Sequence, residues 1–269
     1  MEPILKVENL VKRYAKQNFA GSPQEFVALD GVSFTVSAGT TLAIVGESGS
    51  GKSTLASCIA CLETPTAGNL WFDGGNLAQA TESDLRKIRP QIQLIFPDPA
   101  SALNPRWSIL DIVVEPLLLQ GKLRRNDRNT RACSLLERVG LSADMAERPA
   151  AELSGGQRQR LAIARALTLD PKILILDEAL SALDCSVQAQ IANLLLELQS
   201  SLGMTFLFIT HDLIMAAHLA DELAVMSHGR IVEQGPSTKI LRKPTHEATR
   251  QLLSAVPQLP RAPRPATNQ

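Results

Sequence analysis

A glycine-rich run between residues 46 and 53 carries the most specific chemical pattern of this sequence. The run is Gly46-Glu47-Ser48-Gly49-Ser50-Gly51-Lys52-Ser53. Glycine permits backbone angles that other residues avoid, so successive N–H groups can turn inward around a phosphate. The spacing is that of a phosphate-binding P-loop, in which the lysine reaches the β- and γ-phosphates and the serine hydroxyl binds Mg²⁺.

The sequence on either side of the run supports this interpretation. An apolar strand is expected over residues 42–45, and apolar residues recur at helical spacing after Lys52, which is the context that the motif requires. The glycine spacing is the reverse of a dinucleotide fingerprint, so NAD binding is disfavoured. A chance glycine-serine turn before a helix is the structural alternative. The candidate phosphate-binding residues are Gly46, Ser48, Gly49, Ser50, Gly51, Lys52, Ser53 and Thr54.

Two acidic residues, Asp177 and Glu178, follow the apolar run 173–176. Asp177 can hold Mg²⁺, directly or through water, beside the hydroxyl of Ser53. Glu178 is placed to polarise an attacking water. Acids at the end of a strand are by themselves usually solvated turn residues, but a P-loop earlier in the chain favours the functional interpretation.

A third pattern, Leu153-Ser154-Gly155-Gly156-Gln157, begins another predicted helix. A serine and two glycines at a helix start can form a second cradle for an anion. An ordinary helix N-cap would satisfy the same five residues.

The hydrophobic pattern predicts the elements that position these residues. Strands are expected over 4–14 and 26–45, with turn signals at 30–31 and 38–39 and a polar hairpin loop over 15–24. Further expected elements are a helix over 52–62, a strand over 69–73, a helix near 83–88 and a strand over 92–96.

From residue 98 to residue 167 the pattern becomes helical, with helices expected over 109–119, 129–139 and 155–167. Strands are then expected over 173–176, 205–209, 222–226 and 230–233, with helices over 186–199 and from residue 212. Continuous apolar runs between helices indicate a parallel sheet covered on both faces. The predicted fold class is α/β: a P-loop NTPase core with a mixed, largely parallel sheet, an N-terminal antiparallel β region and an inserted α-helical lobe.

Composition limits the remaining classes of function. Lysine plus arginine number 27 and aspartate plus glutamate number 27, so no global field recruits nucleic acid or an anionic membrane. Acidic and basic residues within the first eight positions argue against a signal peptide, and the apolar runs are too short to span a membrane. Four cysteines are too few for a disulfide framework. Cys58 and Cys61 have the C-x-x-C spacing of some redox and metal sites. We interpret them instead as small buried residues.

Together these motifs resemble the ATP-binding subunits of ABC transporters, and the resemblance covers residues 5–257. Their order is highly specific to that family: P-loop, Leu-Ser-Gly-Gly-Gln, Asp177-Glu178, Ser181-Ala182-Leu183-Asp184 and Thr210-His211-Asp212. In the family two such domains stack head to tail, and each ATP with Mg²⁺ lies between the P-loop of one and the signature motif of the other. The resemblance implies one ABC ATPase domain over 1–256, with a helical lobe over 98–167 and a C-terminal extension over 236–256. A proline-rich disordered tail is expected over 257–269.

The resemblance also implies roles for individual residues. Glu178 would be the catalytic base, and His211 would contact the γ-phosphate and link it to the opposite subunit. Tyr14 stands where the family places an aromatic that stacks on adenine, although strand tyrosines commonly just pack. The signature residues Ser154, Gly155, Gly156 and Gln157 would bind the nucleotide held by the P-loop of the other domain.

Within the family, residues 98–106 and 243–257 look like segments of the dipeptide, oligopeptide and nickel permease subunits, in particular the second, shorter ATPase. This likeness implies ATP hydrolysis that energises import through a membrane complex. The implied partners are a second ATPase subunit, identical or different, two integral membrane permease subunits and, indirectly, an extracytoplasmic substrate-binding protein, but no nucleic acid. The implied location is peripheral, on the cytoplasmic face of the inner (plasma) membrane.

Pro97 departs from the family, which has glutamine at this position. Proline offers no side-chain hydrogen bond and stiffens the loop, which favours a slow ATP site on this chain. In that hypothesis the chain works in an asymmetric pair, and its intact signature motif completes the site of a sister ATPase. The alternative is that Asp98 or a shifted loop replaces the glutamine and that activity is ordinary. Ala179 stands where many relatives carry proline, and we expect little effect. A soluble, non-transport ABC ATPase is a further alternative, which usually carries two such domains in one chain.

Overall fold

The computed structural model describes residues 3–17, 23–98, 102–122, 124 and 127–255. The strands are β1 (Leu5–Gln17), β2 (Pro23–Val36), β3 (Thr41–Val45), β4 (Ala67–Phe72), β5 (Gly75–Asn76), β6 (Ile92–Ile95), β7 (Ile173–Asp177), β8 (Thr205–Thr210), β9 (Glu222–Ser227) and β10 (Arg230–Pro236). The α-helices are α1 (Lys52–Ile59), α2 (Glu82–Ile88), α4 (Ile109–Leu119), α5 (Arg128–Arg138), α6 (Gly155–Leu167), α7 (Cys185–Leu202), α8 (Leu213–Leu219), α9 (Ser237–Arg242) and α10 (Glu247–Ser254). Short 3₁₀ helices cover Leu77–Gln79, Arg89–Gln91, Ala143–Met145 and Ala150–Glu152.

The N-terminal strands form an antiparallel sheet with the order β2-β1-β4-β5. The register of β1 and β2 extends from Leu5 opposite Val36 to Gln17 opposite Pro23. The hairpin loop expected over 15–24 is therefore too long, because both strands continue into it. The turn signal at Asp30-Gly31 is also not a chain reversal: Gly31 has φ +74° within β2, where the register with β1 shifts, as at a bulge.

The second sheet has six strands in the order β10-β9-β3-β8-β7-β6. Its ladders are parallel except for the β9–β10 pair. The carboxyl ends of parallel strands meet at one edge of a sheet, where ligands of open α/β sheets bind. The loops after β3, β7 and β8 lead to Gly46, Glu178 and His211, so the fold brings these motifs to one edge. The predicted fold class, a mixed and largely parallel sheet with an antiparallel N-terminal region, is confirmed.

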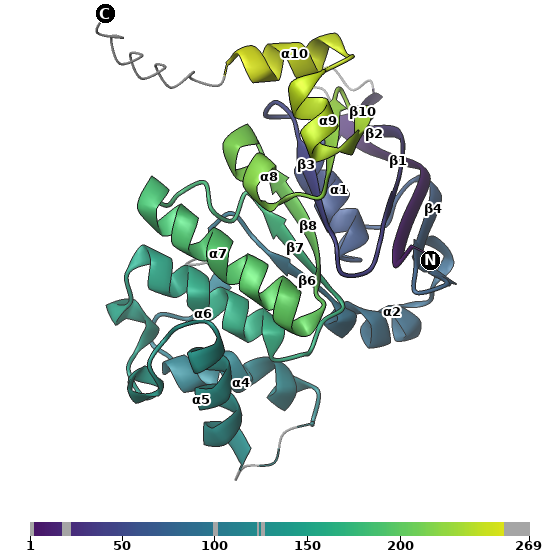
Figure 1. Ribbon diagram of the computed structural model, residues 1–269. Coiled ribbons are helices and arrows are strands. Elements are labelled where there is room, and N and C mark those ends of the chain that lie inside the picture. Colours follow the sequence, from purple (N-terminus) through teal and green to yellow (C-terminus); the bar gives the residue numbers. More distant parts are fainter. Residues whose placement is uncertain (1–2, 18–22, 99–101, 123, 125–126, 256–269) are drawn as a thin grey trace, which may run out of the picture.

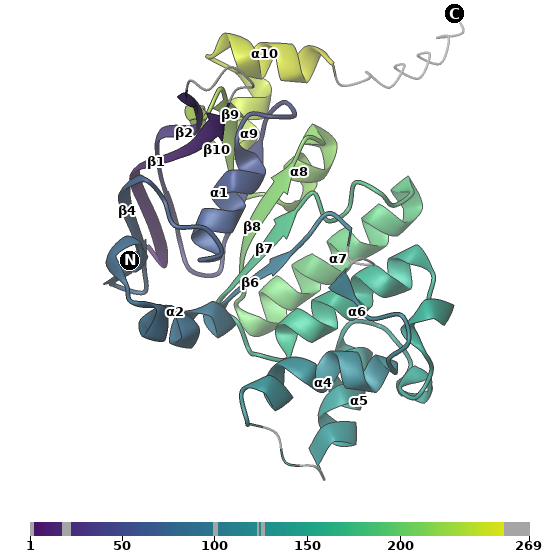
Figure 2. The same cartoon turned by 180° about the vertical axis from the view of Figure 1, so that it is seen from behind.

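The six-stranded sheet separates two hydrophobic cores because its side chains alternate between faces. Leu174 and Phe206 belong to the core formed with α4, α6 and α7, whereas Ile175 and Leu207 belong to the core formed with α1 and the antiparallel sheet. Figures 1 and 2 show the same division: α4, α5, α6 and α7 gather on one side, and α1 lies between the two sheets on the other.

Residues 98–167 contain α4, α5 and α6, and the described part of this segment has no strand. The bounds of α4 and α6 coincide with the expected ranges, and serines cap both helix starts: the Asp111 N–H donates to Ser108 Oγ, and the Gln157 N–H donates to Ser154 Oγ. The helix expected over 52–62 is shorter, ending at Ile59 before Cys61 at φ +57°.

The short C-terminal helices α9 and α10 are elements that the hydrophobic pattern did not predict. The second of them, α10, is held by the carboxylate of Glu233 in β10. It accepts hydrogen bonds from the N–H and hydroxyl of Thr245 (both 2.8 Å), the N–H of His246 (3.0 Å) and the hydroxyl of Thr249 (2.5 Å). The predicted disordered tail, 257–269, lies outside the described residues. None of the helices described for this chain is long and apolar enough to cross a membrane.

Candidate functional site

The P-loop is pressed against two neighbouring strands, which explains two of its glycines. A Cβ added at Gly46 would lie 2.2 Å from the carbonyl oxygen of Met226 in β9, and one added at Gly51 would lie 2.4 Å from that of Ala28 in β2. Gly51 also has φ +105° where α1 begins, a conformation that glycine adopts without strain. The loop is therefore fixed between β9 and β2 at the start of a helix.

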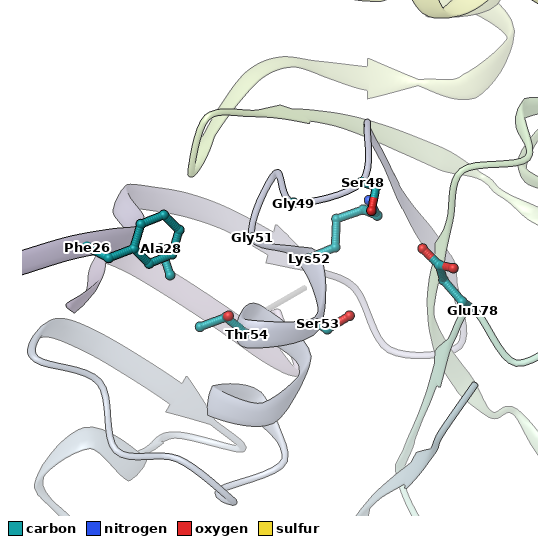
Figure 3. Close-up of a pocket in the computed structure, with 9 residues that line it drawn as sticks. All are labelled: Phe26, Ala28, Ser48, Gly49, Gly51, Lys52, Ser53, Thr54 and Glu178. Carbon is teal, nitrogen blue, oxygen red and sulfur yellow. The ribbon is translucent and has the colours of Figure 1, made fainter. Parts of the chain in front are cut away.

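A cavity of about 220 Å³ lies over the P-loop. Its lining joins residues of β2, the P-loop, α1 and the loop after β7: Phe26, Ala28, Ser48, Gly49, Gly51, Lys52, Ser53, Thr54 and Glu178. Figure 3 shows Phe26 and Glu178 on opposite sides of the P-loop residues. The cavity therefore has an aromatic end at Phe26 and a charged end at Lys52 and Glu178.

Lys52 supplies the positive charge of this cavity. Its side chain is buried, and Nζ donates hydrogen bonds to the carbonyl oxygens of Gly46 (2.9 Å) and Glu47 (2.8 Å). Burial lowers the pKa of Lys52, while the nearby carboxylates of Glu178 and Asp177 act in the opposite direction. The P-loop thus holds the Lys52 ammonium group where a bound phosphate could take the place of its two carbonyl acceptors.

Asp177 at the end of β7 has the properties of a metal ligand. It is 4% exposed, and its Oδ1 has no hydrogen-bond partner among the residues that the structure describes. Burial raises the pKa of Asp177 and outweighs the hydrogen bond with the Ser53 hydroxyl, which acts in the opposite direction. Mg²⁺ usually takes one or two protein oxygens and completes its shell with phosphate oxygens and water. The unpaired carboxylate oxygen and the serine hydroxyl therefore fit a magnesium ion bound with a phosphate.

Glu178 is held in an unusual backbone conformation beside His211. Its φ is +46°, a region that costs a non-glycine residue energy and that recurs at functional sites. The Glu178 N–H donates to the Ile209 carbonyl (2.9 Å), and the Ser181 N–H and hydroxyl donate to the Glu178 carbonyl. One carboxylate oxygen lies 3.5 Å from His211 Nδ1. These contacts aim the carboxylate into the cavity, which His211 does not line.

The signature residues Ser154, Gly155, Gly156 and Gln157 do not line this cavity. They begin α6 as a reciprocal capping box, in which Ser154 N–H donates to Gln157 Oε1 (2.9 Å) and Gln157 N–H donates to Ser154 Oγ (3.3 Å). Ser154 and Gly155 are exposed. The chain therefore has two separate glycine-rich helix starts. The second has the geometry of an ordinary helix N-cap and is also open to solvent.

Tyr14 is absent from the cavity lining, and its cross-strand partner Phe26 is present. The Tyr14 hydroxyl donates to Glu63 (2.5 Å), and Lys12 Nζ lies 5.1 Å from the centre of the ring. Burial and the hydrogen bond to Glu63 raise the pKa of Tyr14. Phe26, by contrast, is 55% exposed. Sequence reasoning missed Phe26 because the hairpin register that pairs it with Tyr14 depends on the loop length.

The remaining candidates lie outside the cavity. Pro97 is exposed in a bend after β6 and is not a lining residue. Cys58 and Cys61 are free and buried, and burial raises their pKa values to about 12 and about 11. Since the thiolate is the reactive form, both cysteines are unreactive at neutral pH, in agreement with their prediction as packing residues.

Comparisons with known proteins agree on one family. The family model described as ABC transporter matches residues 29–181. The dipeptide transport ATP-binding protein DppF of Haemophilus influenzae is 45% identical over 258 residues, which are 96% of this chain and 79% of that protein. DppF of Escherichia coli is 44% identical over 259 residues, which are 96% of this chain and 78% of that protein. The dimeric post-hydrolysis structure of the ATP-binding cassette MJ0796, bound to ADP and Pi, is 31% identical with a TM-score of 0.76, covering 87% of this chain and 98% of that one.

Proposed function

The chain belongs to the ABC transporter family, as an ATP-binding ATPase subunit, and from that premise we propose that it hydrolyses ATP to energise the import of peptides or a nickel-type cargo. The observation that carries the proposal is the cavity over the P-loop, where Lys52 and Ser53 of α1 lie together with Glu178, which follows β7. The relatives named for dipeptide transport support peptides as the cargo class. The charged and aromatic ends of the cavity match the two ends of a nucleoside triphosphate.

In this proposal the triphosphate lies along the P-loop, with its γ-phosphate toward Glu178. The backbone N–H groups of residues 48–54 and the N-terminus of α1 bind the β- and γ-phosphates. Lys52 exchanges its bonds to two carbonyls for bonds to phosphate oxygens. Mg²⁺, when bound by Ser53 and Asp177, would neutralise charge that develops on the phosphates.

Glu178 acts as the general base that takes a proton from the attacking water. Its backbone contacts restrict where its carboxylate can lie, which is what positioning for proton transfer requires. His211 orients the carboxylate from 3.5 Å and contacts the γ-phosphate. The adenine lies toward the aromatic end, on Tyr14 or against the exposed ring of Phe26.

We further propose that a second ATPase subunit, identical or different, completes the site. Ser154, Gly155, Gly156 and Gln157 of one subunit would bind the γ-phosphate held by the P-loop of the other. The exposure of Ser154 and Gly155 and the absence of all four residues from the cavity lining of their own chain support this arrangement. The remaining proposed partners are two integral membrane permease subunits and, indirectly, an extracytoplasmic substrate-binding protein. The chain would then lie on the cytoplasmic face of the membrane.

Pro97 supports a second candidate, a subunit whose own site is slow while its signature serves a sister ATPase. The loop after β6 offers a proline where the family resemblance implies a glutamine side chain, so it supplies no amide for the attacking water.

The proposed function is tested by producing the chain together with two candidate integral membrane permeases of the peptide-importer type. Co-purification in detergent and ATP hydrolysis that rises when the cognate binding protein and cargo are added are the expected results. A chain that binds ATP but never associates with those permeases would contradict the transport role. A chain that binds no ATP would contradict the nucleotide site itself.

A further inference from the structure

Gly229, in the turn between β9 and β10, bridges two segments that are far apart in the sequence. Its N–H donates to the carbonyl oxygen of Ser50 in the P-loop (2.9 Å), and its own carbonyl accepts from the N–H of Asp30 in β2 (2.8 Å). Gly229 is buried, although it belongs to a hairpin turn. One peptide segment thus fixes the P-loop to the strand beside it.

The bond to Ser50 determines the direction of the next N–H group. The peptide unit between Ser50 and Gly51 is trans, and in a planar trans peptide the C=O and N–H bonds point in opposite directions. With the Ser50 carbonyl held outward by Gly229, the Gly51 N–H points away from the β9–β10 turn. Gly51 lines the cavity, and no acceptor for its N–H is found among the described residues.

From this geometry we infer that Gly229 is a positioning residue for phosphate binding, because it aims the Gly51 N–H at a phosphate oxygen of the nucleotide. The inference rests on the proposed function and adds to it a residue that touches neither the cavity nor the ligand. A backbone donor already held in its bound direction loses little entropy on binding. A loosened Ser50 carbonyl would let the peptide unit rotate and would weaken that donor.

The site demands glycine for two reasons. Gly229 has φ +76°, and a Cβ added there would lie 2.9 Å from the Ala28 carbonyl oxygen and 3.3 Å from the Ala28 carbonyl carbon. Ala28 also lines the cavity, so a side chain at position 229 would push between the turn and the wall of the site. The turn is further anchored by Arg230, whose Nε and Nη2 donate to Asp30 Oδ2 at 2.8 and 2.6 Å.

The chain contains a matched control for the strain of a left-handed residue. Gly74 occupies the same place in the β4–β5 hairpin turn, with φ +81° and open space around its Cβ position. The preceding residues, Asp73 and His228, also match, with φ +48° and +47°. Gly229→Ala and Gly74→Ala therefore introduce the same backbone strain, and only Gly229→Ala disturbs the contact with the P-loop.

The test measures ATP affinity, thermal unfolding without nucleotide, and the ATP-induced shift of the Gly51 amide signal in protein labelled with ¹⁵N-glycine. We expect Gly229→Ala to weaken ATP binding by about tenfold, the loss of roughly one well-aimed hydrogen bond, and to diminish the Gly51 shift. Gly74→Ala should bind ATP as the wild type does. ATP affinity and a Gly51 shift in Gly229→Ala equal to those of Gly74→Ala would overturn the inference while leaving the proposed function intact.

A second variant keeps the test decisive if Gly229→Ala does not fold. Arg230→Ala leaves the glycine and its N–H in place and removes the side-chain link between the turn and Asp30, while the bond from the Asp30 N–H to the Gly229 carbonyl remains. The ATP-induced shift of the Gly51 amide should then decrease from its wild-type value. An unchanged shift would contradict the role of the turn, whereas a wild-type chain that binds no ATP would contradict the proposed function instead.

Discussion

His211 Nδ1 lies 3.5 Å from a carboxylate oxygen of Glu178, and the two residues follow the neighbouring strands β8 and β7. The imidazole can therefore fix the direction of the carboxylate without occupying the cavity. In the proposed hydrolysis, Glu178 would accept the proton of the attacking water and His211 would orient the carboxylate.

Glu178→Gln should retain ATP and lose hydrolysis. Glutamine preserves the size of the side chain and removes its basicity, so we expect the turnover rate to fall by about 100-fold or more while ATP affinity changes little. Single-turnover hydrolysis and nucleotide titration measure the two quantities separately. Full activity in this variant would remove Glu178 from its role as the base.

Lys52→Ala should lose ATP affinity, because Lys52 is the only cation among the described residues that line the cavity. Charge-assisted hydrogen bonds to phosphate contribute about 1.5–3 kcal/mol, so a loss of about tenfold or more is expected. Titration with a fluorescent ATP analogue measures the change. Lys87→Ala is the control, since Lys87 is an exposed residue of α2 paired with Asp84. Unchanged affinity in Lys52→Ala would contradict the P-loop assignment.

Phe26→Ala should weaken the binding of ATP but not of inorganic tripolyphosphate, which has no base to contact the ring. An aromatic contact contributes about 0.5–1.5 kcal/mol beyond the area that it buries, so a loss of about three- to tenfold is expected for ATP alone. Competition titrations with both ligands provide the comparison. The neighbouring Val27 is also exposed but is not a lining residue, so Val27→Ala should change neither affinity.

Tyr14→Phe separates the contributions of the two aromatic residues. It removes the bond to Glu63 and keeps the ring, so undiminished ATP affinity in Tyr14→Phe together with a loss in Tyr14→Ala would support stacking by Tyr14.

Equal loss of ATP and tripolyphosphate binding in Phe26→Ala would show that the Phe26 ring supports the P-loop and does not contact the base.

Glu233→Gln should destabilise the fold in a way that depends on pH. Burial raises the pKa of Glu233, but hydrogen bonds from Thr249, Thr245 and His246 outweigh it and lower the pKa from its ordinary 4.5 to about 2. A lowered pKa means that the ionised group stabilises the fold above pH 4.5 and that this contribution is lost as the pH falls toward 2. We expect a deficit of about 1 kcal/mol at pH 7 that narrows below pH 4.5.

Urea unfolding of the wild type and of Glu233→Gln over this pH range measures that deficit. Glu137→Gln serves as a control, since Glu137 is an exposed residue of α5 and its replacement should change the unfolding free energy little. A deficit that stays constant with pH would show that the charge of Glu233 is not what holds α10.

Pro97→Gln distinguishes the ordinary ATPase from the slow one. If the proline withholds an amide that the attacking water needs, the variant should hydrolyse ATP faster in the assembled transporter, by about tenfold or more within the range for a well-positioned polar group. ATP affinity should stay the same, since Pro97 does not line the cavity. No gain in rate would argue against an impaired site.

The elements that sequence reasoning located best combine a strong hydrophobic period with a polar cap. The bounds of α4 and α6 fit their predicted ranges because Ser108 and Ser154 are N-caps, whose side chains accept hydrogen bonds from backbone N–H groups of the first helical turn. The buried strands β3, β7 and β8 were recognisable as continuous apolar runs. Their common edge then places Lys52, Asp177 and Glu178 together.

The parts that could not be predicted depend on contacts between distant residues. Helix α10 is held by Glu233, whose partners lie 12 to 16 positions later in the chain, and no hydrophobic period reports such bonds. The exposure of Phe26 follows from the register of β1 and β2. The bond between Gly229 and Ser50 joins a turn and a loop whose proximity only the order of the strands determines.

Because the six-stranded sheet has a different core on each face, substitutions at neighbouring positions of one strand affect different cores. In β7 and β8 the even-numbered Leu174, Leu176, Phe206 and Phe208 lie on one face and the odd-numbered Ile173, Ile175, Leu207 and Ile209 on the other. A methyl group removed at Leu174 would therefore loosen the core that α6 shares, whereas one removed at Ile175 would loosen the core that α1 shares. In the proposed pair of subunits, a change at an even-numbered position of these two strands would affect the helix start offered to the neighbouring subunit, and a change at an odd-numbered position would affect the subunit's own P-loop.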